Sequence, residues 1–382
     1  APASGSGPSP GGCLAAGRSG ACLGRAGEEP GVGLLQRRAA GLLAGQGNLP
    51  TRALSQPLPG WRAPLLLQSA PSPPAMSADP TPYLEASRPL AWLHVPKTGT
   101  SLINTLVHTP GLCPGVPSDM VINRTTYCNQ CNPFNNWMAG HFESQYPAHL
   151  ACPDGVLKYA AHVSIGGTFQ KHYKGHGVTL LRQPEQRLIS SYNHNLHDFP
   201  RATLGGRPEN ISLPKYAELV QGCYVKMLTG KHVKGNDCGE PGAPKQQEVR
   251  KAKRRLQTFA FVGIMEEWDQ SICLWHAMFG GLCYGSELMD TRDAGGGTAE
   301  GHDYPLEDLQ GFVDHADREV YAFAQEIFRE RSRQYGVSRA SCQACYDHAA
   351  QHWAPEPDGR AWGGVDWASK QGLPPGVPGW TG

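Results

Sequence analysis

Apolar residues between positions 89 and 345 alternate between short continuous runs and helical periodicity. The runs 90–95, 178–181 and 259–264 have the length and composition of fully buried strands. Each run is followed by a stretch in which apolar residues recur every three or four positions, as on one face of a helix. Strands that alternate with helices form parallel sheets. The pattern predicts an α/β fold with a central, mostly parallel sheet and helices on both faces.

The helices after these strands can be placed by proline and by their apolar faces. We expect one helix from about Thr100, a second with Pro184 in its first turn, and a third that carries Trp268. A long amphipathic helix is expected between Pro305 and Gly336. The residues expected to face the core are Leu102, Ile103, Leu106, Val107, Leu188, Ile189, Tyr192, Trp268, Ile272, Trp275, Phe279, Leu309, Phe312, Val313, Val320, Phe323 and Ile327.

The two ends of the chain differ from this core. Segment 1–85 is rich in Gly, Ala, Pro, Ser and Arg, so it cannot bury enough apolar surface to offset its ordering entropy. We expect it to be disordered, either low-complexity sequence or a targeting leader. Segment 86–348 is expected to be the folded domain, and 349–382 a Gly/Pro/Trp-rich tail. No apolar run reaches about 18 residues, so no spanning helix is expected, and an anchor upstream of residue 1 is left open.

The charge of the chain gives no sign of a nucleic-acid partner. The 34 lysine and arginine residues nearly balance 33 acidic residues, so there is no global basic field. The local run KQQEVRKAKRRLQ offers Lys251, Lys253, Arg254 and Arg255 to an acidic glycan. Apolar residues at helical spacing within the same run favour a solvated helix face over a packed stripe.

The twelve cysteines are many for a cytosolic protein. Two CxxC pairs, Cys128/Cys131 and Cys342/Cys345, would together supply four thiolates for zinc. More than 200 residues separate the pairs, and no other ligand pattern supports a zinc site. We therefore favour disulfides, with Cys273–Cys283 as one expected bridge.

The stretch LHVPKTGTSL turns from an expected strand directly into an expected helix. Such a turn aims backbone N–H groups and the positive end of the helix dipole at one point. Gly99 lets the backbone approach a ligand, and Lys97 adds a positive charge. Hydroxyl groups come from Thr98, Thr100 and Ser101. We expect a phosphate or sulfate group to bind here; the alternative is an ordinary βα turn with a solvated lysine.

A second anion site is expected in VTLLRQPEQRLISSYNH. Arg182 ends an expected strand, and Ser190 lies two helical turns beyond it, so both suit one phosphate. Open α/β sheets bind ligands where parallel strands end in this way. The first turn is not a Walker A loop, because its lysine precedes the only glycine. No downstream strand ends in a lone aspartate suited to magnesium, so a metal-dependent nucleotide hydrolase is disfavoured.

These motifs resemble those of sulfotransferases. HVPKTGTS resembles their 5′-phosphosulfate loop, and LRQPEQRLISSYNH resembles their 3′-phosphate segment. FAFVGIMEEWDQSICL is similar to a strand-and-helix block of the Golgi-type carbohydrate sulfotransferases, a group that includes the heparan sulfate 2-O- and 6-O-sulfotransferases. The resemblance covers residues 90–285. It implies a P-loop-like, three-layer fold that binds 3′-phosphoadenosine 5′-phosphosulfate (PAPS) and transfers its sulfuryl group without a metal ion.

The resemblance also implies roles for individual residues. A fixed ammonium group near the bridging oxygen stabilises the charge that develops there, so Lys97 is expected to be catalytic as well as donor-binding. By matching positions, the 5′ side of PAPS is expected at Lys97, Thr98, Gly99, Thr100 and Ser101, and its 3′-phosphate at Arg182 and Ser190.

The acceptor hydroxyl needs a base. WMAGHFES places His141 after a glycine, and the heparan sulfate 2-O- and 6-O-enzymes have their catalytic histidine in a similar setting. Imidazole titrates near neutrality and suits this role. His162 is the second candidate and Glu143 the third, whereas His94 and His194 are expected to be structural.

The expected reaction is sulfuryl transfer to a hydroxyl of a carbohydrate, such as an anionic polysaccharide or another glycan. Transfer to a protein tyrosine or a small alcohol is one alternative, and a non-catalytic glycan- or nucleotide-binding relative is another. Cysteines and the sequons at Asn123 and Asn210 favour the Golgi lumen or another part of the secretory pathway. The Arg-rich leader leaves a plastid as the alternative.

Overall fold

A parallel sheet of three strands joins the apolar runs seen in the sequence. The strands are β1 (Ala91–Trp92), β2 (Gly177–Leu181) and β3 (Phe261–Ile264), in the order β1-β2-β3. Every strand residue is buried, which explains why the runs contain no alternating polar positions. The computed structural model describes residues 77–117, 120–122, 152–159, 162–199, 210–231, 238, 240–289 and 304–352, all within one compact unit of the chain, Leu67–Gly382.

Helices make up most of the other described elements. They confirm the coarse prediction of an α/β arrangement around an open parallel sheet. In chain order they are α1 (Pro82–Ser87), α2 (Leu102–His108), η1 (Val156–Tyr159), α6 (Gly167–His172), α7 (Pro184–Asn193), α9 (Leu213–Val220), α10 (Cys223–Thr229), α11 (Gln246–Leu256), η2 (Met265–Glu267), α12 (Trp268–Phe279), η3 (Gly285–Glu287), η4 (Leu306–Leu309), α13 (His315–Gln334) and α14 (Gln343–Gln351).

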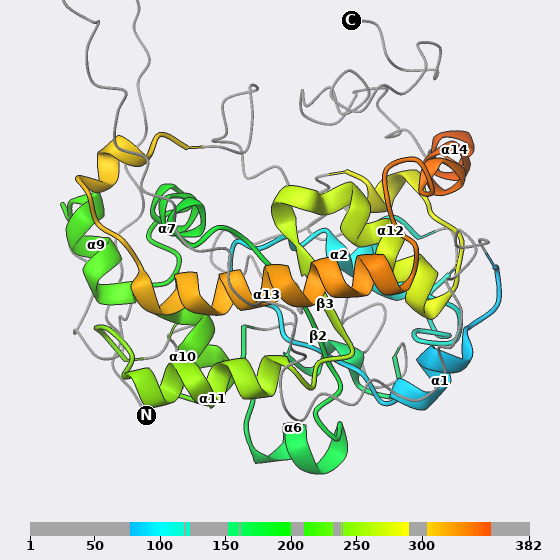
Figure 1. The fold of residues 1–382 in the computed structure, drawn as a ribbon, viewed down its shortest axis with the longest axis horizontal. Helices are drawn as coiled ribbons and strands as arrows, with labels where there is room; N and C mark the ends of the chain where they lie inside the picture. Colours follow the sequence, from blue (N-terminus) through cyan, green and yellow to red (C-terminus); the bar gives the residue numbers. More distant parts are fainter. Residues whose placement is uncertain are drawn as a thin grey trace, which may run out of the picture. The chain divides into compact units, whose positions relative to one another are not determined.

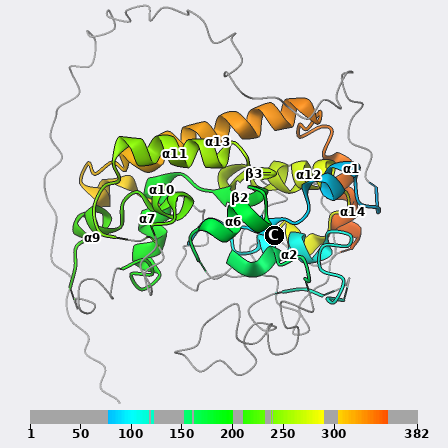
Figure 2. The ribbon, with the colours of Figure 1, turned by 90° about the horizontal axis from the view of Figure 1, so that it is seen from below.

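Helices lie on both sides of the sheet. The long helix α13 packs against β3 and alongside α11 (Figure 1). Seen from below, α11 and α13 lie together on one side of β2 and β3, and α2 and α6 lie on the other (Figure 2). Helices α2, α7 and α12 follow β1, β2 and β3, as the sequence pattern predicts. The connections after the three strands therefore leave from one edge of the sheet.

The long C-terminal helix begins later than predicted. The segment after Pro305 forms the short helix η4, and Gln310 then takes a left-handed conformation (φ 51°) that ends it. Helix α13 begins at His315, where the Asp314 side chain caps it by accepting a hydrogen bond from the Asp317 amide (3.1 Å). Leu309 and Phe312 belong to a separate apolar cluster with α7 and α9.

Four disulfides cross-link the described residues, and one predicted bridge is wrong. Cys273 pairs with Cys342 and Cys283 with Cys345, so Cys273–Cys283 does not form. These two bridges tie α14 and the segment before it to α12 and the segment after it. The other two are Cys113–Cys152 and Cys223–Cys238. The second CxxC pair is thus consumed by disulfides, while Cys128 and Cys131 lie outside the described residues.

Two helices cross the domain boundaries drawn from composition. Helix α1 spans the one at residue 85 and buries Leu84, and α14 spans the one at residue 348. None of the helices in the described part of the chain is long and apolar enough to cross a membrane. The four disulfides are consistent with a secreted or lumenal protein.

Candidate functional site

The loop after β1 has an unusual backbone. Lys97 and Gly99 both have positive φ, 64° and 102°, and the buried Thr98 between them donates its hydroxyl hydrogen to the Val95 carbonyl (2.9 Å). Left-handed conformations are costly for lysine, so the surrounding structure has to impose this one. The loop is therefore a tight turn with a defined conformation and not an extended linker.

Trp268 explains why the loop contains glycine. A Cβ atom on Gly99 would lie 2.5 Å from the Trp268 ring and 3.3 Å from the Leu180 side chain. Trp268 is the first residue of α12, and its indole N–H donates to the Glu287 carbonyl (2.8 Å). The loop thus packs against a tryptophan ring that a hydrogen bond holds in place, and only glycine fits at the contact.

Helix α2 contributes less to an anion site than the sequence suggests. It has seven residues, and Ser101, its N-cap, makes no capping hydrogen bond. The amides of Leu102, Ile103 and Asn104 donate to the carbonyls three residues earlier, at 3.0–3.3 Å. Because these N–H groups are occupied, hydrogen-bond donors for an anion have to come from the loop residues 97–101 themselves.

Arg182 is held at the end of β2, next to the end of β1. β1 pairs with β2 in parallel, so the Lys97 loop and Arg182 leave the same edge of the sheet. The Tyr224 hydroxyl donates to the Arg182 carbonyl (2.5 Å), and the Arg182 guanidinium lies 5.4 Å from the centre of the Tyr304 ring. Ser190 is buried two helical turns further, on α7. The structure therefore brings the two predicted anion segments to one edge.

Two aspartates behind Arg182 were missed by the sequence analysis. Asp317 accepts hydrogen bonds from the amides of Tyr224 and Val225 at the start of α10 (2.9 and 3.2 Å), and Asp314 accepts one from Gly222 (2.7 Å). Burial, together with the charge of Asp314, raises the pKa of Asp317 to about 8. This pair holds α10, whose Tyr224 positions Arg182. In the sequence, the only signal for it was the spacing of Asp314 and Asp317 at the start of α13, which suits an N-cap.

Imidazole rings gather beside the loop. The His94 Nε2 atom lies 3.1 Å from the Thr100 hydroxyl, and the His94 and His162 ring centres are 4.4 Å apart. The His162 and His197 ring centres are 5.0 Å apart. His162 is buried and has a left-handed backbone (φ 52°). The second sequence candidate for the base therefore lies next to the predicted donor loop.

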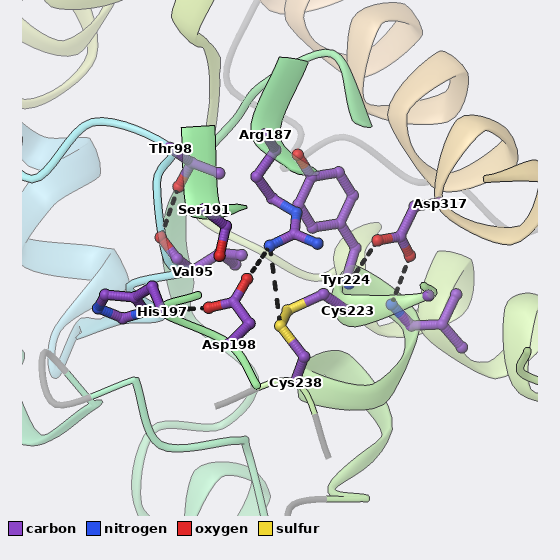
Figure 3. The surroundings of a disulfide bond; sticks show 12 residues. Val95, Thr98, Arg187, Ser191, His197, Asp198, Cys223, Tyr224, Cys238 and Asp317 are labelled. Carbon is purple, nitrogen blue, oxygen red and sulfur yellow. Dashed lines mark hydrogen bonds and ion pairs between the residues drawn. A yellow bond between two sulfur atoms is a disulfide. The ribbon is translucent and has the colours of Figure 1, made fainter. Parts of the chain in front are cut away.

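His197 donates into a buried ion pair. Its Nδ1 atom lies 3.0 Å from a carboxylate oxygen of Asp198, whose other oxygen accepts from Arg187. Asp198 lies between the His197 ring on one side and Arg187 with the Cys223–Cys238 disulfide on the other (Figure 3). Burial alone would raise the pKa of Asp198, but Arg187 and His197 hold it well below its ordinary value. Asp198 is therefore a carboxylate at every physiological pH.

Two sequence candidates cannot be placed. His141 and Glu143 lie outside the described residues, as do the sequon at Asn123 and the tryptophans of the tail. Asn210 of the second sequon is exposed just before α9. One group among the described residues has metal-ligand spacing, namely Asp198, Cys223 and Cys238. Its two cysteines form a disulfide, so they are not thiolate ligands.

The basic run on α11 is largely used for packing. Lys251 and Arg255 donate to the carbonyls of Thr229 and Leu228 at the end of α10 (3.3 and 2.7 Å). The Lys253 ammonium lies 5.2 Å from the Phe323 ring centre. Val249, Ala252 and Leu256 are buried, as the interpretation of a helix face over an apolar stripe requires. Arg254 is exposed. These contacts favour a structural role over a glycan site.

Comparison of the chain with models of protein families, with curated proteins and with solved structures finds no match. The function therefore has to be argued from the residues and their arrangement.

Proposed function

We propose that this chain is a sulfotransferase that moves the sulfuryl group of PAPS to a hydroxyl of a carbohydrate. One observation carries the proposal: the segment around Lys97 and the segment from Arg182 to Ser190 leave the same edge of a parallel sheet, from neighbouring strands. A donor with phosphates at both its 5′ and 3′ positions needs two anion sites at such an edge. The family resemblance of both segments supports the same donor.

The donor set fits this ligand. Lys97 supplies the charge that stabilises the bridging oxygen as the sulfur–oxygen bond breaks. Thr98, Gly99, Thr100 and Ser101 surround the 5′ side, and Arg182 with Ser190 takes the 3′-phosphate, with the guanidinium planar and its backbone fixed by Tyr224. Most of the rate enhancement in such transfers comes from positioning and charge stabilisation, and no metal ion is part of the proposal.

The proposal extends to the fold and the compartment. We assign the sheet and its helices to a P-loop-like, three-layer fold, and the protein to the Golgi lumen or another part of the secretory pathway, in line with its disulfides. The acceptor is a glycan, with an anionic polysaccharide as the first class to test. A histidine takes the hydroxyl proton, and His141 is the candidate that the sequence favours.

The decisive experiment combines a binding and a transfer assay. The purified full chain is titrated with adenosine 3′,5′-bisphosphate by calorimetry and incubated with PAPS and a panel of desulfated polysaccharides. We expect binding, and release of the bisphosphate only with an acceptor. Lys97→Ala should abolish transfer, whereas Lys215→Ala, an exposed lysine on α9 paired with Glu218, should not change it. Failure to bind the bisphosphate would refute the proposal.

The same assay separates the alternatives. Transfer to a tyrosine peptide or a small alcohol, with none to polysaccharides, would replace the acceptor class and keep the reaction. Bisphosphate binding without transfer to any acceptor would leave a non-catalytic relative. His141→Ala should lower transfer and spare bisphosphate binding if His141 is the base.

A further inference from the structure

The residues after α7 form a tight turn that fixes His197. Asn195 and Leu196 both have positive φ, 61° and 50°, although neither is glycine. The His197 amide donates to the Ser191 carbonyl (3.0 Å), and the Asp198 amide donates to the Tyr216 hydroxyl (3.3 Å). Two successive left-handed residues are costly and persist only where the surroundings impose them. This turn holds His197 and Asp198 in one arrangement.

The His197–Asp198 pair extends from the interior of the protein to its surface. Asp198 and its partner Arg187 are fully buried, whereas the His197 side chain keeps 25% of its surface exposed. His94 is almost completely buried and His162 nearly so. His197 is thus more accessible to a substrate than His94 or His162, and its Nδ1 atom lies 3.0 Å from the Asp198 carboxylate.

The carboxylate fixes the tautomer of His197. Because Asp198 is ionised, Nδ1 of the neutral ring carries the proton and donates it to the carboxylate, so Nε2 carries the lone pair. Arg187 in turn holds Asp198, and its ring-stacked partner Tyr224 is the residue that positions Arg182. A base oriented by a buried carboxylate is an arrangement that favours general-base catalysis.

The position of the pair relative to the donor loop follows from the ring contacts. His197 touches His162, His162 touches His94, and His94 lies within hydrogen-bond distance of Thr100. α7 starts at the same sheet edge as the loop, and the turn that carries His197 ends α7. His197 is therefore connected to Thr100 of the first predicted anion segment through two imidazole rings, and it lies next to Ser191 at the end of the second segment.

We propose that His197, oriented by Asp198, is the general base of the transfer reaction. This inference rests on the proposed function. Nε2 of His197 takes the proton of the acceptor hydroxyl while the hydroxyl oxygen forms a bond to sulfur. The bond from sulfur to the bridging oxygen breaks, and its electron pair stays on the 5′-phosphate of the departing adenosine 3′,5′-bisphosphate. Asp198 is a positioning residue, and no further reactant is needed.

Single-turnover kinetics with an acceptor that the wild type uses will test this. His197→Ala and His197→Gln should each lower the rate about 10²- to 10⁴-fold and leave bisphosphate affinity unchanged. Added imidazole should restore part of the rate of His197→Ala, which a structural role does not predict. His172→Ala, at an exposed position on α6, is the matched control and should keep the full rate.

Two results would overturn the assignment while the proposed function stands. In one, both His197 variants keep the wild-type rate and His141→Ala loses it. In the other, the His197 variants lose bisphosphate affinity together with the rate, or their circular dichroism spectra show a loss of folded structure. Either result would make His197 a structural residue. A wild type that binds no bisphosphate overturns the proposed function itself, and the assignment with it.

Discussion

Two fully buried carboxylates in this protein differ in their partners: Asp198 has an arginine as well as a histidine, whereas Glu287 has two histidines. Asp198 pairs with Arg187, whose guanidinium stays charged at any accessible pH. Glu287 lies between His108 and His276, at 3.0 and 2.5 Å from their ring nitrogens, and imidazoles are charged only on the acidic side. Asp198 contacts His197, whereas the Glu287 carbonyl accepts from the Trp268 indole, which lies against Gly99 of the loop after β1. The arginine partner of Asp198 therefore keeps its charge as pH changes, whereas the histidine partners of Glu287 lose theirs as pH rises.

The pKa shifts of the second group set its pH window. Burial alone would lower the pKa of His276, but Glu287 raises it above its ordinary value. Burial alone would raise the pKa of Glu287, but His276 and His108 lower it. The histidine contributes stability below its unfolded pKa and loses it as pH rises through the raised folded value; the glutamate contributes above its unfolded pKa and loses it as pH falls through the lowered one. The cluster is therefore most stabilising between about pH 4.5 and 6.5.

Breaking the Arg187–Asp198 ion pair should have the largest effect on the free energy of unfolding. Arg187→Met keeps the volume but leaves Asp198 buried without its guanidinium, which costs about 3–5 kcal/mol. Urea unfolding measures this free energy. Arg333→Met is the matched control, because Arg333 is exposed and pairs with Glu330 at the surface; it should cost at most about 0.5 kcal/mol. Equal stability of the two variants would show that the buried pair is unimportant.

Gly99→Ala tests whether Trp268, which is bound to the Glu287 carbonyl, supports the loop after β1. The alanine meets both a left-handed backbone and the Trp268 ring, so we expect a loss of about 2–4 kcal/mol and weaker bisphosphate binding. Gly311→Ala is the control: its φ is also positive, 83°, but no atom lies within 4 Å of the added Cβ. It should cost only the backbone strain, about 1 kcal/mol. Identical losses would mean that Trp268 does not constrain the loop.

The sequence predicted the sheet and the loop because both depend on local chemistry. Buried parallel strands need continuous apolar runs, and the turn after β1 needs glycine where its backbone takes a positive φ of 102°. The start of α13 was missed because Leu309 and Phe312 continue the helical spacing while packing on a different cluster. Asp314, three residues before Asp317, was the available capping signal.

The rest of the site depends on contacts between distant residues. No spacing rule pairs Cys273 with Cys342, 69 positions away, or joins Asp198 to Arg187. His197 and Asp198 are neighbours in a polar stretch that looks like an ordinary loop in the sequence. Only the fold shows that Asp198 is fully buried and that His197 touches His162. Ring contacts and burial, unlike hydrophobic periodicity, are properties of the assembled chain.

Trp268→Phe should have a smaller effect than Gly99→Ala and should separate packing from loop support. The variant loses the indole hydrogen bond to the Glu287 carbonyl and part of the ring, at a cost of about 1–3 kcal/mol. Trp275→Phe is the matched control, because its indole N–H also makes one buried bond, to Thr109 (2.8 Å), away from Gly99. Both should be destabilised, but only Trp268→Phe should weaken bisphosphate binding in calorimetry. A weaker affinity in both would remove the specific link.

Glu287→Gln should have the smallest effect and the most specific one. The amide keeps the shape of the side chain but removes the charge that raises the pKa of His276. In the wild type, loss of the His276 proton as pH rises through its raised pKa should lower stability by on the order of 1 kcal/mol between about pH 6 and pH 8.5. Asp317, whose pKa is about 8, adds to this fall in the wild type and in the variant alike. The variant should be less stable than the wild type near pH 6 and closer to it near pH 8.5.

Arg187→Met completes this comparison, because it breaks the other carboxylate's pair. In the wild type, Asp198 and Arg187 do not change charge between about pH 6 and pH 8.5, but Arg187→Met removes the charge that holds down the pKa of the buried Asp198. The pKa of Asp198 should rise in this variant, so its stability should be lower and should fall at least as steeply with pH as that of the wild type. Glu287→Gln should flatten the slope instead. Urea unfolding at both pH values for all three proteins distinguishes the cases. If Glu287→Gln keeps the wild-type slope, the pH dependence belongs to other groups, and the cluster beneath Trp268 is a fixed support like the one behind His197.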